Sequence, residues 1–272
     1  QPRSRGLGDV YKRQFLAIAD MPFKLFNKRF GVGLVMQQES LGLFKNMNIG
    51  AQIAYKQKLF KGTLSIGAQI GFFDQSFKGS EVYIPDDDDY HQSTDEAIPQ
   101  QDIRGNAFDL GLGLFYTHRW FWAGLSATHL NSPSVKLDAE TGENGNERNY
   151  EFNLGRTLYF MAGSNIPVKN TLFEVLPSVL VKTDFTFTTW EATARVRYNK
   201  FLTGGFGYRW KDAAYVVLSA EFKGFYIGYS YDYPTSAIAK ASSGSHEIFA
   251  GYSLKLDLGE KNKHRHKSVR IM

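Results

Sequence analysis

Four consecutive aspartates form the densest group of chemically active side chains in the sequence, at 86–89. Carboxylate oxygens bind calcium, but a helix-loop-helix calcium site needs alternating ligands and a central glycine, which this run lacks. We therefore expect a solvated extracellular loop rather than a specific metal site. The candidate contact residues are Asp86, Asp87, Asp88, Asp89 and Tyr90.

The histidines and the lack of cysteine argue against metal, thiol or hydrolase chemistry. His91, His118, His129 and His246 share no spacing typical of a ligand set. The sequence has 0 cysteines, which excludes a thiol metal site and a disulfide scaffold. No Ser-His-Asp order with an oxyanion-forming glycine motif is visible. We predict that the protein is not an enzyme and binds no cofactor.

A third group of charges alternates with apolar residues. Glu191, Arg195 and Arg197 fall on one face of a strand at 189–199, because successive strand residues point to opposite sides. Ala194 and Val196 fall on the other face. Charges are costly towards lipid but tolerated in a polar lumen, so this row predicts the inside of a membrane barrel. Two roles stay open: internal ion pairing that fills the barrel, or a path for solutes.

The same alternation extends over most of the chain. In the segment 213–222, Val216, Leu218 and Phe222 share one face, whereas Tyr215 and Ser219 share the other. Aromatic residues make up 15% of the chain and glycine occurs 26 times, but no apolar run of about eighteen residues is present for a membrane helix. Strands with one apolar and one small or polar face are typical of a membrane β-barrel.

Periodicity and turn residues predict about thirteen strands. They lie at 15–22, 29–40, 46–58, 63–75, 106–117, 120–130, 149–165, 171–184, 189–199, 201–210, 213–222, 225–233 and 245–257. The turns after odd-numbered strands are short and mostly basic, whereas the long connections, 77–105, 131–148 and 234–244, all follow even-numbered strands. This sorting predicts an all-β, antiparallel up-and-down barrel of the outer-membrane type, with the short turns in the periplasm.

Strand parity also predicts what flanks the barrel. Residues 1–14 lack strand alternation and the order of a secretory signal, so we interpret them as a non-native, adapter-like leader. The barrel at 15–258 would then lack its first strand, since bacterial barrels have an even number, here about fourteen. One edge of the sheet should therefore be open beside 245–256. The basic tail at 259–272 would lie in the periplasm.

The positive charge of the chain does not indicate nucleic-acid binding. The net charge of +5 is modest, and much of it falls in turns and in the tail. A nucleic-acid site would place such charge on one face together with stacking aromatics, but the aromatics here occupy alternating strand positions. The tail cations are Lys261, Lys263, Arg265, Lys267 and Arg270, which are either a solvated end or a contact for an acidic periplasmic partner.

Several segments resemble the PorP/SprF family of type IX secretion system membrane proteins. They include AFDLGLGLFY, FLTGGFGYRW and FYIGYSYDYP followed by GSHEI, and the resemblance extends over about 15–256. It implies an outer-membrane β-barrel that works with the type IX machinery, supports secretion or surface attachment of adhesins and is linked to gliding motility. The basic tail is similar to that of gliding-associated relatives.

The leading hypothesis is thus a non-enzymatic barrel in the outer-membrane lipid whose loops at 77–105 and 131–148 engage the C-terminal domain of a secreted adhesin. A rival hypothesis is an outer-membrane channel or substrate-specific transporter, because a barrel of this size can be plugged or open. A purely structural barrel is a third possibility.

Overall fold

The computed structural model describes residues 12–82, 99, 101–137, 140–141, 147–148, 150–236, 239 and 243–254. Its main element is one antiparallel sheet of 14 strands. Thirteen of them pair in chain order, and β12 (Ile166–Pro167) pairs with β13 beside this path. The predicted all-β, up-and-down architecture is confirmed.

The strands match the predicted segments closely. Their bounds are β1 (Lys12–Leu25), β2 (Lys28–Leu41), β3 (Phe44–Leu59), β4 (Gly62–Lys78), β5 (Asp102–Thr117), β6 (Phe121–Thr128), β11 (Thr157–Ser164), β13 (Phe173–Thr183), β14 (Thr188–Tyr198), β15 (Leu202–Arg209), β16 (Ala213–Phe222), β17 (Phe225–Pro234) and β18 (Ser245–Tyr252). The first strand thus begins at Lys12, inside the segment 1–14 that we predict to be a leader. The predicted strand at 149–165 is too long, because β11 begins only at Thr157.

The connection before β11 holds small elements that the sequence did not indicate. β7 (Ser134–Lys136) pairs with β10 (Glu151–Asn153), and β8 (Glu140–Thr141) pairs with β9 (Glu147–Arg148). A 3-10 helix, η1 (Gly79–Glu81), follows β4. In the part of the chain described, no helix is long and apolar enough to cross a membrane.

The sheet has two unlike ends, which we name by their connections. The turn end carries the connections after β1, β3, β5, β11, β14 and β16, of which the longest is 165–172. The loop end carries the others, including 79–101, 129–156 and 235–244. The predicted sorting of short and long connections is therefore confirmed.

Three turn-end connections are two-residue hairpin turns in which both central residues have positive φ. These angles are typical of type I′ turns, whose twist suits paired strands. The pairs are Phe26 and Asn27 (49° and 57°), Phe60 and Lys61 (46° and 62°), and Lys223 and Gly224 (49° and 91°).

The two faces of the sheet differ as the alternation predicted. On β5, Phe108, Leu112 and Leu114 are exposed, whereas Asp109 between them is only 2% exposed. On β16, Val216 and Leu218 are likewise exposed. We call the face with the exposed apolar side chains the outer face and the face with Asp109 the inner face. Few apolar side chains are buried among the described residues, so the usual hydrophobic core of a water-soluble domain is lacking.

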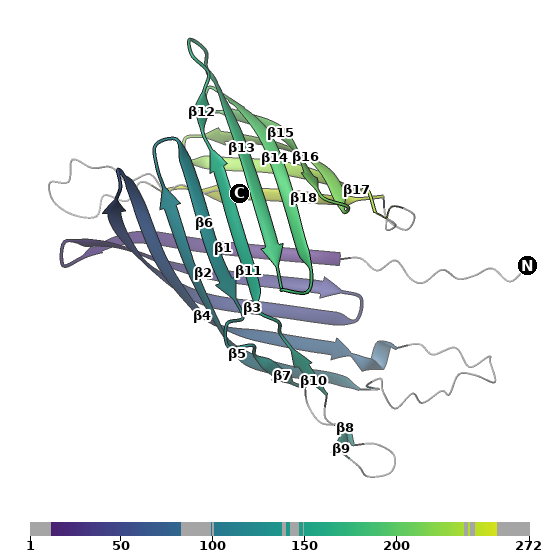
Figure 1. The fold of residues 1–272 in the computed structure, drawn as a ribbon. Helices are drawn as coiled ribbons and strands as arrows, with labels where there is room; N and C mark the ends of the chain where they lie inside the picture. The colour runs from purple at the N-terminus through teal and green to yellow at the C-terminus, as the bar shows by residue number, and fades with distance from the viewer. Residues whose placement is uncertain are drawn as a thin grey trace, which may run out of the picture.

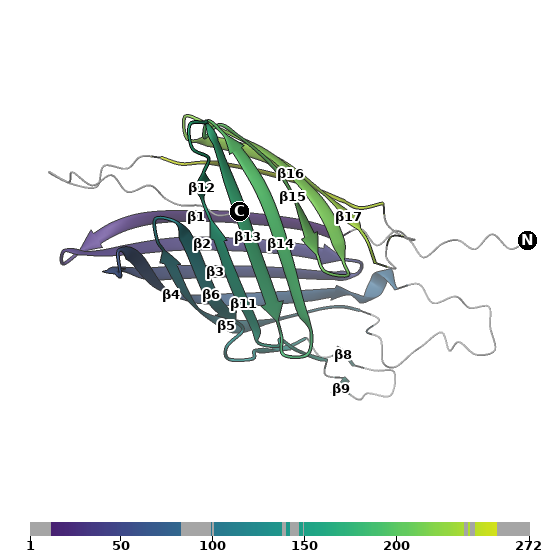
Figure 2. The same ribbon diagram turned by 45° about the horizontal axis from the view of Figure 1, so that its top comes forward.

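The sheet curls, so that the early strands β1–β5 and the late strands β13–β17 form opposite sides of the molecule (Figures 1 and 2). Among the described strands, β1 pairs only with β2, and β18 pairs only with β17. Beside 245–252, β18 thus has no second partner among the described strands, and the predicted open edge stays a prediction. Closure into a complete barrel stays a prediction.

Candidate functional site

The loop and tail residues singled out from the sequence lie outside the described residues. This applies to the contact candidates at 86–90 and to the tail cations between 261 and 270. Their roles stay predictions. The described candidate surfaces are the charged inner face, the packed loop end and the basic turn end.

The three charged residues predicted on β14 lie on the inner face, between the exposed outer residues Trp190 and Tyr198. Arg197 stands directly opposite Glu174 on β13 and donates to its Oε2 from Nε at 2.7 Å. Because the two charges are in register on neighbouring strands, the pair stabilises the β13–β14 hairpin as well as neutralising the inner face.

Glu191 belongs to a larger network near the loop end. It accepts from Nε of Arg209, its register partner on β15, at 3.1 Å and from the Tyr215 hydroxyl at 2.6 Å. Arg209 also reaches Asp212 at 3.1 Å and Asp232 at 3.5 Å. One guanidinium thus pairs with three carboxylates from three parts of the chain. Sequence reasoning missed Arg209, because only the register of β14 and β15 brings it to Glu191.

The early strands have an uncharged polar inner face. Gln52 on β3 donates to Gln69 on β4 at 2.7 Å, and the two stand opposite each other. Towards the loop end, the side-chain oxygens of Asn46, Asn48 and Gln75 are buried without a hydrogen-bond partner in the structure. Such groups carry a desolvation penalty, which water in the interior would relieve.

The loop end is packed rather than open around β5. Asn131 extends the ladder of β5 where β6 has ended: its Oδ1 accepts from Leu110 N–H at 3.1 Å and its Nδ2 donates to Phe108 O at 2.7 Å. Beyond it, β7 lies against β5, where Val135 is fully buried (Figure 1). A Cβ on Gly105 would collide with the Lys136 carbonyl and stand 3.0 Å from Val135 Cγ1, so this packing requires glycine.

A second anchor of this loop is the contact between Asp109 and His129. Nδ1 of His129 lies 3.0 Å from Oδ1 of the buried Asp109. The ring also meets Phe73 edge-on at 6.2 Å. The start of the 129–156 connection is therefore fixed to the sheet.

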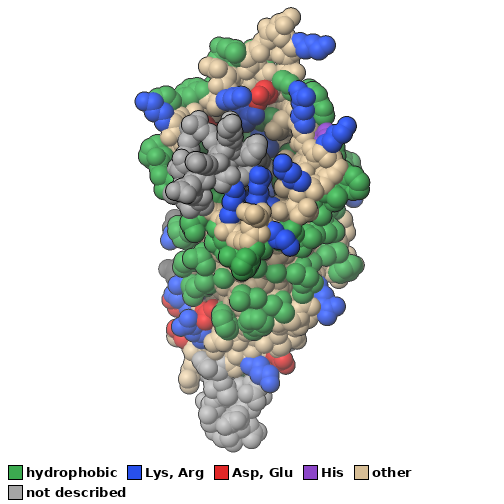
Figure 3. Space-filling view, turned by 90° about the vertical axis from the view of Figure 1, so that its left-hand side faces the viewer, with side chains coloured by type: hydrophobic (Ala, Val, Ile, Leu, Met, Phe, Trp, Pro, Cys, Tyr) green, Lys and Arg blue, Asp and Glu red, His purple; other side chains and the backbone are tan. Residues whose placement is uncertain are grey.

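The turn end is dominated by cations. Lysine or arginine occurs in most of its connections, for example at Lys61, Arg119, Lys169, Lys200 and Lys223. Figure 3 faces this end, and Lys and Arg side chains gather in its upper half with few acidic side chains among them. Sequence reasoning found the basic turns but not that two of them line a common pocket, which is described below.

The predictions that the protein has no cofactor and is not an enzyme stay predictions. Within the described ranges, no group of three or more His, Cys, Asp or Glu side chains could hold a metal ion. No curated protein matches the chain. The family model for the type IX secretion system membrane protein PorP/SprF matches residues 4–252.

Proposed function

The chain belongs to the PorP/SprF family of type IX secretion system membrane proteins, and we propose that it is a non-enzymatic outer-membrane barrel that supports secretion or surface attachment of adhesins used in gliding motility. The family match over residues 4–252 carries this proposal. The matched family consists of membrane proteins of the secretion system. The exposed apolar side chains of the sheet agree with a place in a membrane.

The outer face supports a place in lipid. Large side chains such as Phe72, Leu112 and Leu218 are 57–60% exposed, which in water would favour aggregation. Aromatic pairs flank this band at both ends: Trp190 stacks on Trp210 at 4.9 Å near the loop end, and Phe173 meets Tyr198 at 5.0 Å near the turn end. Trp190 and Tyr198 are eight residues apart on β14, about 26 Å along a strand, similar to the apolar band of outer-membrane barrels.

The loop end is the surface that we assign to the secreted client. It carries the longest connections, and the part held by Asn131, His129 and β7 is fixed on the sheet. A fixed surface costs less ordering entropy on binding than a free loop. The aspartates at 86–89 belong to the adjoining connection, and the C-terminal domain of an adhesin is the proposed partner. The basic tail would face an acidic periplasmic component.

Deleting the gene tests this proposal. We expect the cognate adhesin to disappear from the cell surface, measured by antibody labelling of intact cells, and gliding to stop. Complementation with the unchanged gene should restore both. If the adhesin stays on the surface of the deletion strain in the normal amount, the proposed function is wrong.

The rival function, an outer-membrane channel, is favoured by one observation. The inner face carries polar groups in both halves of the sheet, with amides on β3 and β4 and ion pairs on β13–β17. Conductance of the purified protein in planar bilayers separates the two functions. A stable single-channel conductance that falls when Arg195→Glu reverses an inner charge would favour the channel, whereas a docking barrel need not conduct.

A further inference from the structure

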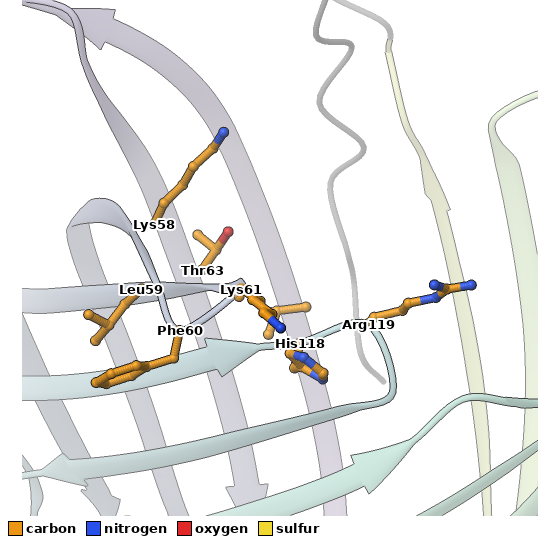
Figure 4. A pocket seen from close by; sticks show the side chains of 9 residues that line it. Lys58, Leu59, Phe60, Lys61, Thr63, His118 and Arg119 are labelled. Carbon is orange, nitrogen blue, oxygen red and sulfur yellow. The ribbon is translucent and has the colours of Figure 1, made fainter.

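Two neighbouring turns at the turn end line an open pocket that the proposed function does not use. The β3–β4 and β5–β6 connections line a cavity of about 520 Å³. Its charged walls are Lys58, Lys61 and Arg119, with His118 between them (Figure 4). The hydroxyl groups of Thr63 and Thr117 complete a lining that contains no carboxylate. We call this site the cationic notch.

The notch is held in shape by contacts between its two turns. The hydroxyl of Tyr116, on β5, lies 3.2 Å from Leu59 O and 2.9 Å from Phe60 O and donates to these carbonyls of the β3–β4 turn. A Cβ on Gly62 would stand 2.5 Å from Thr117 O and 2.6 Å from the Tyr116 ring, so only glycine allows this approach. The backbone of the two turns that carry the notch cations is therefore held in one arrangement before any ligand binds.

The β3–β4 turn is unusual in its residues. Type I′ turns favour Asn and Gly because both central residues have positive φ, yet this one uses Phe60 and Lys61. A bulky side chain in this region is strained, and such strain is concentrated at functional sites. With Lys61 in this turn, the notch keeps a cation that an Asn-Gly turn would lack.

The notch cations lack a counter-charge within the part of the chain that the structure describes. Among the described residues, no carboxylate pairs with Lys58, Lys61 or Arg119; the Arg119 guanidinium instead lies 4.9 Å from the Trp120 ring. At the loop end, by contrast, Arg104 pairs with Asp74 and Arg209 with three carboxylates. The lining thus carries three cations and no acid, and an anion bound among them would gain from each charge.

The strand register shows from which side a ligand reaches the notch. Lys58 stands opposite Thr63, which stands opposite Thr117, so these side chains share one face. Thr117 has the parity of the buried Asp109, which makes this the inner face. Leu59 and Phe60 extend in the opposite direction from Lys58 and Arg119 in Figure 4. Because this lining faces inward at the turn end, a ligand would approach the notch from the inner side of the sheet or from beyond the turn end.

From this arrangement we propose that the cationic notch binds a carboxylate-rich segment of a protein that lies beyond the turn end. Arg119 offers a planar fork for a carboxylate, and Lys58 and Lys61 act as point charges beside it. Assigning that protein to the secretion machinery rests on the proposed function. The binding of carboxylates at the notch does not rest on the proposed function, because it is inferred from the cationic, acid-free lining.

Binding of a fluorescein-labelled oligo-aspartate peptide to the full chain in detergent tests this proposal. The notch variant combines Lys58→Gln, Lys61→Gln and Arg119→Gln, and the control variant combines Lys169→Gln, Lys200→Gln and Lys223→Gln. Both lose three charges from the turn end. By fluorescence anisotropy at about 50 mM salt, where screening is weak, we expect about tenfold weaker binding for the notch variant, since three exposed pairs are lost. The control should change less than about twofold.

Three results would overturn the proposal: equal losses in both variants, unchanged binding by the notch variant, or notch-dependent binding of phosphatidylglycerol vesicles with none of the peptide. The last result would assign the notch to lipid. Heat-modifiable gel mobility shows that a variant is folded, and Lys61→Glu, at an exposed turn position, replaces the triple change if that fails to fold. Adhesin display in the deletion strain is a separate readout, so the proposed function and this inference can fail independently.

Discussion

The connections at the turn end and those at the loop end of the same strands differ in length, charge and packing. At the turn end, short connections hold lysines and arginines that few carboxylates neutralise, and the cationic notch lies between two of them. At the loop end, acids and bases pair within the chain, and β7 buries Val135 against β5. Described charges at the loop end thus pair within the chain, whereas the cations of the notch pair with no described carboxylate.

The largest effect should come from breaking the packed loop end. Val135→Asp would place a carboxylate where the side chain is fully buried, at a cost of several kcal/mol. We expect β7 and β10 to detach while the sheet remains folded. Limited proteolysis should then cut the 129–156 connection much faster than in the wild type. Val168→Asp, in the exposed turn at 165–172, is the matched control; equal cleavage of both variants would contradict the packing described.

A smaller difference is expected between the two inner arginines. Arg209→Leu leaves three carboxylates without their cation near the loop end, whereas Arg197→Leu leaves only Glu174 near the turn end. Because both sites are partly exposed, we expect losses of about 3 and about 1 kcal/mol. Urea titration of folding into phospholipid vesicles measures both. Equal losses would show that the loop-end network is not cooperative.

Relaxing the β3–β4 turn should raise the stability of the protein slightly and remove one of the three notch cations. Replacing Phe60 and Lys61 by Asn and Gly suits the positive φ angles and should add about 1 kcal/mol. The same replacement of Phe26 and Asn27 is the control, since it relaxes a turn outside the notch. Both should raise the urea midpoint, but only the first should weaken peptide binding. A lower midpoint for both would refute the turn assignment.

The smallest effect concerns the loop-end turn at 184–187. The N–H groups of Phe187 and Thr186 donate to Asp184 Oδ1 at 2.6 and 2.9 Å and hold the pKa of Asp184 below its ordinary value. Since the folded pKa is the lower one, this stabilisation is present above pH about 4 and is lost as the pH falls through the folded pKa. Asp184→Ala should remove this part of the pH dependence of the urea midpoint. An unchanged pH profile would contradict it.

Strand positions and faces followed from the sequence because period-two alternation is a local signal. On β14, the alternation alone placed Glu191, Arg195 and Arg197 on the face opposite Val196. The ion-pair partners of these residues could not be predicted from the sequence, because Glu174 and Arg209 come close to β14 only through the registers of two hairpins.

The small loop-end strands and the notch were missed for a different reason. β7 has three residues, too few for a periodic pattern, and it is held by tertiary packing on β5. The notch joins turns that are 55 residues apart or more, and its lock by Tyr116 depends on the pairing of β4 with β5. Basic turns can be read from sequence, but their convergence on one pocket cannot.

The orientation of the two ends in the outer membrane is the central claim, and cysteine labelling tests it most directly. The chain has 0 native cysteines, so Thr186→Cys at the loop end and Lys169→Cys at the turn end each introduce a single thiol. A membrane-impermeant maleimide should label Thr186→Cys in intact cells, and Lys169→Cys only after the outer membrane is permeabilised. Labelling of Lys169→Cys in intact cells, with Thr186→Cys protected, would contradict the account.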